Sequence, residues 1–142
     1  KRSNLAGYRF GFVTGDPGLV ARLLGVRKHA GMMVPLPVQA AATAAWLDDE
    51  HVVVQRERYR ARRAALRQAL IGAGFRIDLS DAGLYLWCTR DEPCWDSVNW
   101  LANRGILVAP GDFYGLAGAR HVRVALTASD EHIAMACQRL AD

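Results

Sequence analysis

The first eleven residues, KRSNLAGYRFG, combine cationic side chains with glycines. Lys1 is followed eight residues later by Arg9, and Gly7 and Gly11 flank this arginine. Neither a helix nor a turn by itself requires this combination. A primary amine can form an imine with a carbonyl group, a guanidinium can bind an anion, and glycine lets a ligand approach the backbone closely. These residue types are compatible with the attachment point of a cofactor, although a lysine is more often a solvated surface charge.

A further cationic side chain lies in the apolar run HVRVAL, residues 121–126. Arg123 is flanked by valines, and burying a guanidinium between strand residues is costly unless it meets an anion. That anion can belong to a ligand, or it can be a carboxylate of this chain in a structural salt bridge. Arg123 is therefore a candidate ligand-binding residue, and a structural salt bridge is the alternative.

The elements that hold the opening segment occupy the first 48 residues. We predict a strand over 7–15, a helix over 17–29 and a helix over 38–47. The strand is rich in aromatic residues and Val. Asp16-Pro17 offers an N-cap and a first-turn proline for the first helix, which Gly31 ends. A single strand cannot pair its own backbone groups, so we expect the rest of its sheet to lie in sequence outside this chain.

The remaining residues predict a compact α+β unit, into which a long helix over 49–71 leads. Asp48 or Asp49 can cap this helix, and the glycines of GAG, residues 72–74, end it. The run LYLWCTR, 84–90, is almost continuously apolar, which predicts a strand covered on both faces. The other predicted elements are strands over 75–80, 106–110 and 121–126 and helices over 93–104 and from about 130 to 140.

Most of the net charge of +4 lies in RERYRARRAALR, residues 56–67. Its arginines recur at three- and four-residue spacing, whereas Tyr59, Leu66 and Leu70 fall on the other side of the helix, as a buried stripe does. A nucleic-acid surface would carry aromatic residues among the arginines, and only Tyr59 does so here. We therefore expect a solvated helix face and no nucleic-acid partner.

Composition agrees with a soluble globular protein, because 51% of the residues are hydrophobic and 23% are charged. The 142 residues suffice for one domain or for pieces of two. No apolar run is long enough to span a membrane, and the basic N-terminus lacks the apolar region of a signal peptide. The three cysteines are scattered without a C-x-x-C pair, so we expect reduced thiols, a cytoplasmic location and no metal site.

The spacing K-x-x-N-L-x-G-x-R-x-G at residues 1–11 resembles the attachment signature of the class I and II, fold-type I, pyridoxal-phosphate aminotransferases. Later motifs of that family are similar to AGLYLW at 82–87, GILVAPGDFYG at 105–115 and HVRVAL at 121–126. Phe10 stands where a smaller aliphatic residue is usual in the family. Order and spacing agree along the entire chain.

The resemblance implies an α/β fold, the C-terminal part of a fold-type I transferase. Residues 1–48 correspond to the last piece of the large cofactor-binding domain. Residues 49–142 correspond to the small C-terminal domain with its linking helix, 49–71. The family's other contacts with the cofactor ring come from sequence before the lysine. We therefore expect this chain to be a segment of a longer protein, or a fragment that needs its other part.

The resemblance also implies a role for each residue singled out above. Lys1 forms the imine with pyridoxal 5′-phosphate and moves a proton between the substrate Cα and C4′ of the cofactor. Arg9 binds the cofactor phosphate, and Gly7 and Gly11 leave room for it. Arg123 binds the substrate α-carboxylate with two parallel hydrogen bonds. No metal is implied.

Three longer segments are similar to actinobacterial succinyldiaminopimelate aminotransferases: KRSNLAGYRFGFVTGDP, RKHAGMMVPLPVQAA and GLYLWCTR. This resemblance implies N-succinyl-L,L-diaminopimelate as amino donor, 2-oxoglutarate as acceptor, a ping-pong reaction and a cytoplasmic homodimer without a membrane partner. A distal substrate carboxylate needs a further cation, for which Arg27, Lys28 and His29 are candidates. A solvated helix end is the alternative interpretation of these residues.

Two other functions keep the same motifs. A C–S lyase of the same fold retains the lysine and both arginines. An aminotransferase-like sensor domain of a transcription regulator does the same without catalysis. The sequence leaves both open.

Overall fold

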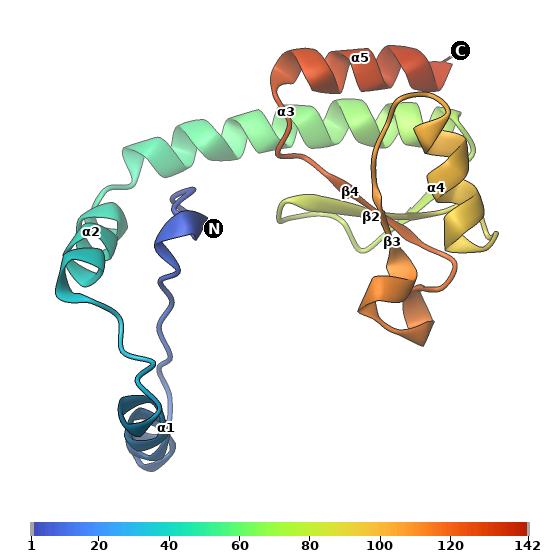
Figure 1. Cartoon of the computed structure of the whole chain (residues 1–142). Coiled ribbons are helices and arrows are strands. Elements are labelled where there is room, and N and C mark those ends of the chain that lie inside the picture. The colour runs from blue at the N-terminus through green and yellow to red at the C-terminus, as the bar shows by residue number, and fades with distance from the viewer. Residues whose placement is uncertain (1, 142) are drawn as a thin grey trace. The chain divides into compact units, whose positions relative to one another are not determined.

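The computed structural model describes residues 2–141 and contains helices and one four-stranded sheet (Figure 1). The chain divides into two compact units, residues 1–55 and 56–142. Lys1, the predicted attachment lysine, lies outside the described residues. The domain boundary predicted between residues 48 and 49 stays a prediction.

The first unit contains the helices α1, Pro17–His29, and α2, Leu36–Leu47, and the short 3-10 helix η1, Ala6–Tyr8. The predicted α1 is confirmed, and its Asp16 carboxylate accepts a hydrogen bond from the Leu19 N–H at 2.9 Å. The helix α2 begins two residues earlier than predicted, because Pro37 lies in its first turn. A proline costs little there, since the first N–H groups of a helix have no intrahelical partner.

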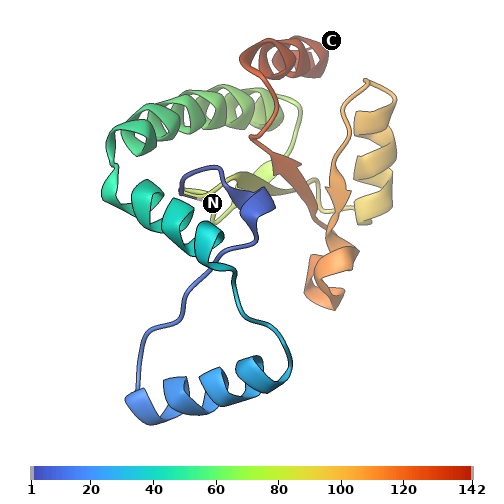
Figure 2. The same ribbon diagram turned by 60° about the vertical axis from the view of Figure 1, so that its left-hand side comes forward.

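The strand predicted over 7–15 is wrong. The chain forms η1 at its start and is unpaired over residues 10–14, which Figures 1 and 2 show as a chain without a neighbouring strand. A strand exists only where a second strand pairs with its backbone N–H and C=O groups. No described residue supplies that strand, so the composition of the segment alone does not produce one.

The long helix α3, Glu50–Gly72, agrees with the helix predicted over 49–71. The Asp48 carboxylate accepts a hydrogen bond from the Glu50 N–H at 2.9 Å, which satisfies one free donor of the first turn. At the other end Gly74 has a φ of +85°, and the Phe75 N–H donates to the Leu70 carbonyl at 2.9 Å. Glycine adopts this left-handed conformation without strain.

The second unit is built on a sheet with the strand order β1-β2-β4-β3, in which every neighbouring pair is antiparallel. The strands are β1, Arg76–Asp78; β2, Tyr85–Thr89; β3, Ala109–Pro110; and β4, Val122–Ala125. The remaining elements are α4, Cys94–Ala102; α5, Asp130–Ala141; and the 3-10 turns η2, Gly111–Tyr114, and η3, Leu116–Gly118. The predicted α+β unit is thus observed, with shorter strands than predicted.

One face of this sheet forms the core with the helices (Figure 1). Leu86 and Val124 point into it, together with the predicted buried stripe of α3, Leu66 and Leu70. The prediction that both faces of 84–90 are covered is wrong, because Tyr85 is 38% exposed. Side chains alternate along a strand, so Tyr85, Trp87 and Arg123 share the opposite face. That face is available to a ligand.

The cysteines are free thiols, as predicted. Cys88 and Cys94 are buried, and Cys137 is half-buried. Burial raises the pKa of the Cys88 thiol to about 12, with a smaller contribution from the charge of Asp78. Cys88 therefore stays protonated and unreactive at neutral pH, because the thiolate is the nucleophile.

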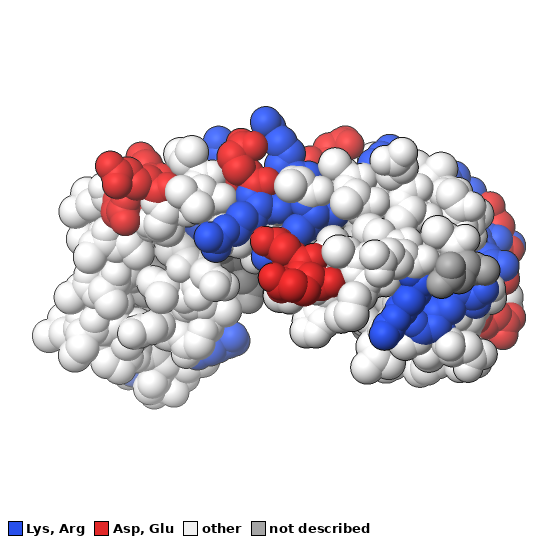
Figure 3. Space-filling model, turned by 90° about the horizontal axis from the view of Figure 1, so that it is seen from above, with Lys and Arg blue, Asp and Glu red and all other residues white. Residues whose placement is uncertain are grey.

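The arginines of α3 in the second unit behave largely as a solvated face. Arg56 and Arg60 are exposed, and Arg60 forms a surface ion pair with Glu57 at 3.6 Å. Arg62 binds the Asp130 carboxylate at 2.6 Å. Figure 3 shows acidic side chains among the basic ones along α3. Over residues 2–141, no helix is both long and apolar enough to cross a membrane.

Candidate functional site

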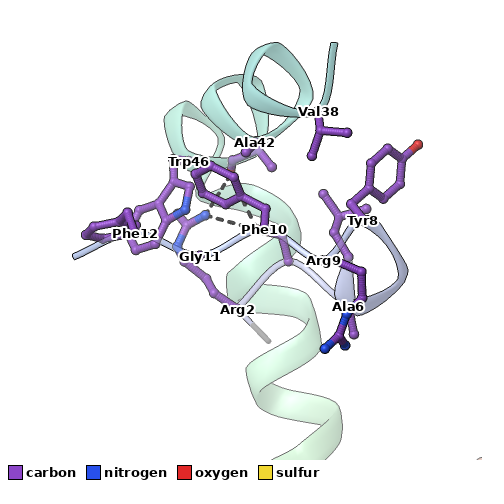
Figure 4. Close-up of a pocket in the computed structure, with 13 residues that line it drawn as sticks. Arg2, Ala6, Tyr8, Arg9, Phe10, Gly11, Phe12, Val38, Ala42 and Trp46 are labelled. Atoms are coloured by element: carbon purple, nitrogen blue, oxygen red, sulfur yellow. Dashed lines mark hydrogen bonds between the residues drawn. The ribbon is translucent and has the colours of Figure 1, made fainter. Parts of the chain in front are cut away.

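Arg9 lies beside a hollow of about 440 Å³ in the first unit (Figure 4). Its side chain is exposed, and its guanidinium makes no hydrogen bond or ion pair with residues 2–141. Its backbone has a φ of +54°, a left-handed conformation that is uncommon for a residue with a side chain. Such conformations concentrate at ligand-binding sites. Arg9 therefore presents an unpaired cation to a concave surface.

Gly7 and Gly11 flank Arg9 in the structure as in the sequence, and Gly11 also lines the hollow. A Cβ atom added to either glycine would meet nothing within 4 Å. Packing within the described residues therefore does not require glycine at either position. The open space above both backbones is compatible with the close approach of a ligand.

Arg2 has a structural role that no motif of the sequence indicates. Its guanidinium donates to the carbonyl oxygens of Ala45 at 2.6 Å and Asp48 at 3.2 Å, at the C-terminus of α2. It also forms an ion pair with Asp49 and lies over the Trp46 ring, 4.9 Å from the centroid. A cation is favourable at a helix C-terminus, where carbonyl groups lack intrahelical partners. Arg2 thus fixes the chain next to Lys1 against α2.

Figure 4 shows that the two arginines of this segment point differently: Arg2 points towards α2, and Arg9 extends away from that helix. Arg2 therefore anchors the segment, whereas the guanidinium of Arg9 remains available to a ligand. The sequence offers no signal for this division, because it depends on where α2 ends in space.

The three candidates for a distal carboxylate lie in the last turn of α1. Arg27 donates to the Met32 carbonyl at 2.6 Å, which closes the helix end. It also lines a second hollow of about 490 Å³, together with Arg9. Lys28 and His29 are exposed. Of the three candidates, Arg27 is therefore the one that shares a hollow with Arg9.

Arg123 lies on the open face of the sheet in the second unit, opposite Trp87 in the β2–β4 register. Its guanidinium carbon lies 4.2 Å from the centroid of the Tyr85 ring and 5.2 Å from that of Tyr114. Its Nε is buried and has no hydrogen-bond partner. The guanidinium makes no ion pair with any described residue, so the structural salt bridge left open above is not formed in this part of the chain.

Arg123 is surrounded by aromatic side chains that also contact one another. Trp87 stacks on His121 with 5.1 Å between centroids, and it contacts Tyr114 edge-on at 5.8 Å. His121 Nε2 lies 3.0 Å from the Asp78 carboxylate. The hydrogen bond from Arg76 holds the pKa of Asp78 below its usual value, and the hydrogen bond with His121 adds a smaller contribution in the same direction. Asp78 is thus an ionised carboxylate bound by two partners, and among the described residues no hydrogen bond or ion pair joins it to Arg123.

The predicted site residues are therefore distributed over both units. Arg9 belongs to the first unit and Arg123 to the second. A guanidinium can bind carboxylates and phosphates through charge-assisted hydrogen bonds. Arg9, which is exposed, and Arg123, which is half-buried, are each available to an anion within their own unit.

Comparison with known proteins agrees with these features. Residues 1–140 match the family of class I and II aminotransferases. A probable aminotransferase of Mycobacterium tuberculosis, Rv1178, is 70% identical over 140 residues, which are 99% of this chain and 34% of that protein. The 4-dedimethylamino-4-oxo-anhydrotetracycline transaminase OxyQ of Streptomyces rimosus is 64% identical over 99% of this chain and 39% of its own length.

A solved aminotransferase structure from Neisseria meningitidis superposes with a TM-score of 0.83 at 33% identity. The match covers 99% of this chain and 37% of that one. The chain thus spans between about a third and two-fifths of the length of these proteins.

Proposed function

Because this chain belongs to the class I and II aminotransferase family, we propose that its protein is an aminotransferase that moves an amino group between an amino acid and a 2-oxo acid. Members of this family depend on pyridoxal 5′-phosphate. The fold class expected from the motifs, that of a fold-type I transferase, is confirmed by the match to solved aminotransferases. The activity, the substrates and the roles of individual residues remain our proposal.

The observation that carries the proposal is that Arg9 and Arg123 are both unpaired within residues 2–141. These are the two cations to which the resemblance to the family gives a phosphate and a carboxylate as ligands. Burial of a guanidinium without an anion is costly, and Arg123 is half-buried with its Nε unpaired among the described residues. On the same face of the sheet, the Asp78 carboxylate is bound by Arg76 and His121.

The residues of the first unit fit pyridoxal phosphate. Arg9 offers its guanidinium to the phosphate beside open backbone at Gly7 and Gly11. When bound, the cofactor supplies an electron sink for the bonds of the substrate Cα. Lys1 Nζ accepts the proton from that Cα. Arg123 fixes the α-carboxylate, which orients the Cα–H bond for this transfer.

For the substrates we propose N-succinyl-L,L-diaminopimelate and 2-oxoglutarate, on the strength of the three long motif segments. Arg27 supports a substrate with a distal carboxylate, since it lines a hollow together with Arg9. We also propose a homodimer in the cytoplasm, with small-molecule substrates and no nucleic-acid partner. The dimer is testable by light scattering of the full-length protein, which should give twice the mass of one chain.

The attachment lysine is tested by borohydride reduction of the full-length protein loaded with cofactor, followed by peptide mapping. Reduction converts the imine into a stable pyridoxyl-lysine, and we expect this adduct on Lys1. Lys28 is the only other lysine of this chain, so Lys28→Ala is the matched control and should keep the adduct. Lys1→Ala should abolish it. An adduct mapped to another lysine, or none, would contradict the assignment.

Product analysis separates the proposed reaction from the alternatives. A transaminase needs a 2-oxo acid as acceptor and forms the corresponding amino acid. Release of ammonia and pyruvate without an acceptor would identify a C–S lyase. A protein that forms the lysine adduct but turns over no amino acid would favour the sensor domain.

A further inference from the structure

The guanidinium of Arg123 is contacted by two tyrosine rings, one from the sheet and one from the turn beside it. Tyr85 lies on β2 opposite Ala125, so it is the diagonal neighbour of Arg123 on the same face. Tyr114 ends η2 and contacts the same guanidinium. The distances from the guanidinium carbon to the two ring centroids, 4.2 and 5.2 Å, lie within the range of cation–π interactions.

Two aromatic faces hold a cation in a way that a carboxylate does not. A carboxylate would take up the N–H donors of Arg123 and would repel an incoming anion. A ring face attracts the cation through its quadrupole and leaves the N–H groups in the guanidinium plane unused. The buried Nε without a partner agrees with this arrangement.

We propose that Tyr85 and Tyr114 form an aromatic clamp that orients Arg123 and keeps its donors free for a substrate carboxylate. Both tyrosines are positioning residues that act through the arginine, and their rings rather than their hydroxyl groups carry the effect. The inference rests on the proposed function, because it deepens the role given there to Arg123.

The position of Tyr114 is fixed by its surroundings in the second unit. Its ring meets Trp87 edge-on at 5.8 Å. The turn that carries it is closed by a direct approach of the Gly111 and Gly118 backbones, which leaves no space for a Cβ atom at either glycine. Tyr114 is 52% exposed, so its ring does not close Arg123 off from solvent.

The test uses the full-length protein loaded with cofactor and succinate as a non-reacting carboxylate probe, with binding measured by calorimetry. Tyr85→Leu and Tyr114→Leu remove one ring each and should weaken succinate binding about 3- to 30-fold, the range expected for a partly buried cation–π contact. In turnover, KM for the 2-oxo acid should rise by a similar factor while kcat changes less. Tyr85→Phe and Tyr114→Phe keep the rings and should stay within about twofold of the parent.

Phe113→Leu is the matched control, because Phe113 is the neighbouring exposed aromatic residue of η2 and contacts Trp95 instead of Arg123. It should leave succinate binding unchanged. Cofactor affinity and the unfolding temperature are measured for every variant, so that a loss of folding is recognised. If one Leu variant does not fold, the other ring still tests the clamp.

A double-mutant cycle with Arg123→Ala separates the clamp from direct contact with the ligand. If the tyrosines act through Arg123, Tyr85→Leu should have no further effect on succinate binding in the Arg123→Ala background. An effect that persists there, or Phe variants as weak as the Leu variants, would overturn the clamp. If Arg123→Ala itself leaves succinate binding unchanged, the proposed role of Arg123 fails first, and the clamp fails with it.

Discussion

At the scale of single residues, the two candidate binding arginines are kept available by different means. Arg9 is exposed and relies on a left-handed backbone that turns its side chain away from α2. Arg123 is half-buried and is held between aromatic rings. The half-buried cation gains more from an anion, because its surroundings screen charge less than water does.

Replacement of Arg9 by Gln should weaken binding of pyridoxal phosphate to the full-length protein about 10- to 100-fold. Charge-assisted hydrogen bonds contribute about 1.5–3 kcal/mol, which corresponds to a change in affinity of this size. Fluorescence titration of the apoprotein measures this affinity without turnover. Arg56→Gln is the control, since Arg56 is another exposed arginine. Equal affinities of Arg9→Gln and the parent would remove Arg9 from the phosphate site.

At the scale of elements, the position of each functional side chain depends on contacts made by other residues of its unit. Arg2 anchors the opening segment to the C-terminus of α2. The Gly111–Gly118 contact closes the turn that carries Tyr114. The β2–β4 register brings Trp87 opposite Arg123 and Tyr85 next to it. The clamp is therefore sensitive to changes that do not touch Arg123.

Gly118→Ala should destabilise the protein by about 1–3 kcal/mol, because its Cβ would collide with the Gly111 backbone, which cannot move like a side-chain end. The displaced turn should also weaken succinate binding through Tyr114. Urea unfolding and calorimetry measure the two effects. Gly72→Ala is the control: it has open space and an ordinary φ at the end of α3, so it should leave succinate binding unchanged and should not destabilise the protein.

At the scale of the whole molecule, the two units differ in how they are stabilised. Nearly all buried apolar side chains belong to the second unit, whereas Ala42 is the one described in the first unit. The first unit leaves large apolar side chains such as Leu24, Met32 and Trp46 at least half exposed. Exposed apolar surface of this kind marks a region that another part of a protein covers. Sequence beyond this chain would cover it in the protein we propose.

Amide hydrogen exchange of the 142-residue chain should reveal this difference. Amides of β2 and β4 should be the most protected, because they open only when the core of the second unit unfolds. Amides of α1 should exchange fast, because no residue of that helix is buried. In the full-length protein, α1 should gain protection. Equal protection of α1 and β4 in the 142-residue chain would contradict this description.

The helices could be predicted from the sequence alone, and the motifs resemble those of the family. Asp16-Pro17 and Gly31 bound α1, and the arginine spacing of α3 predicts its buried stripe, because helical hydrogen bonds and faces are set by nearby residues. The motif spacing likewise indicated an aminotransferase. Only the tertiary structure decided that residues 10–14 remain unpaired, that Arg2 binds α2, and that two tyrosines hold Arg123. Strand pairing and the partners of a charge come from residues distant in the chain, so no local pattern specifies them.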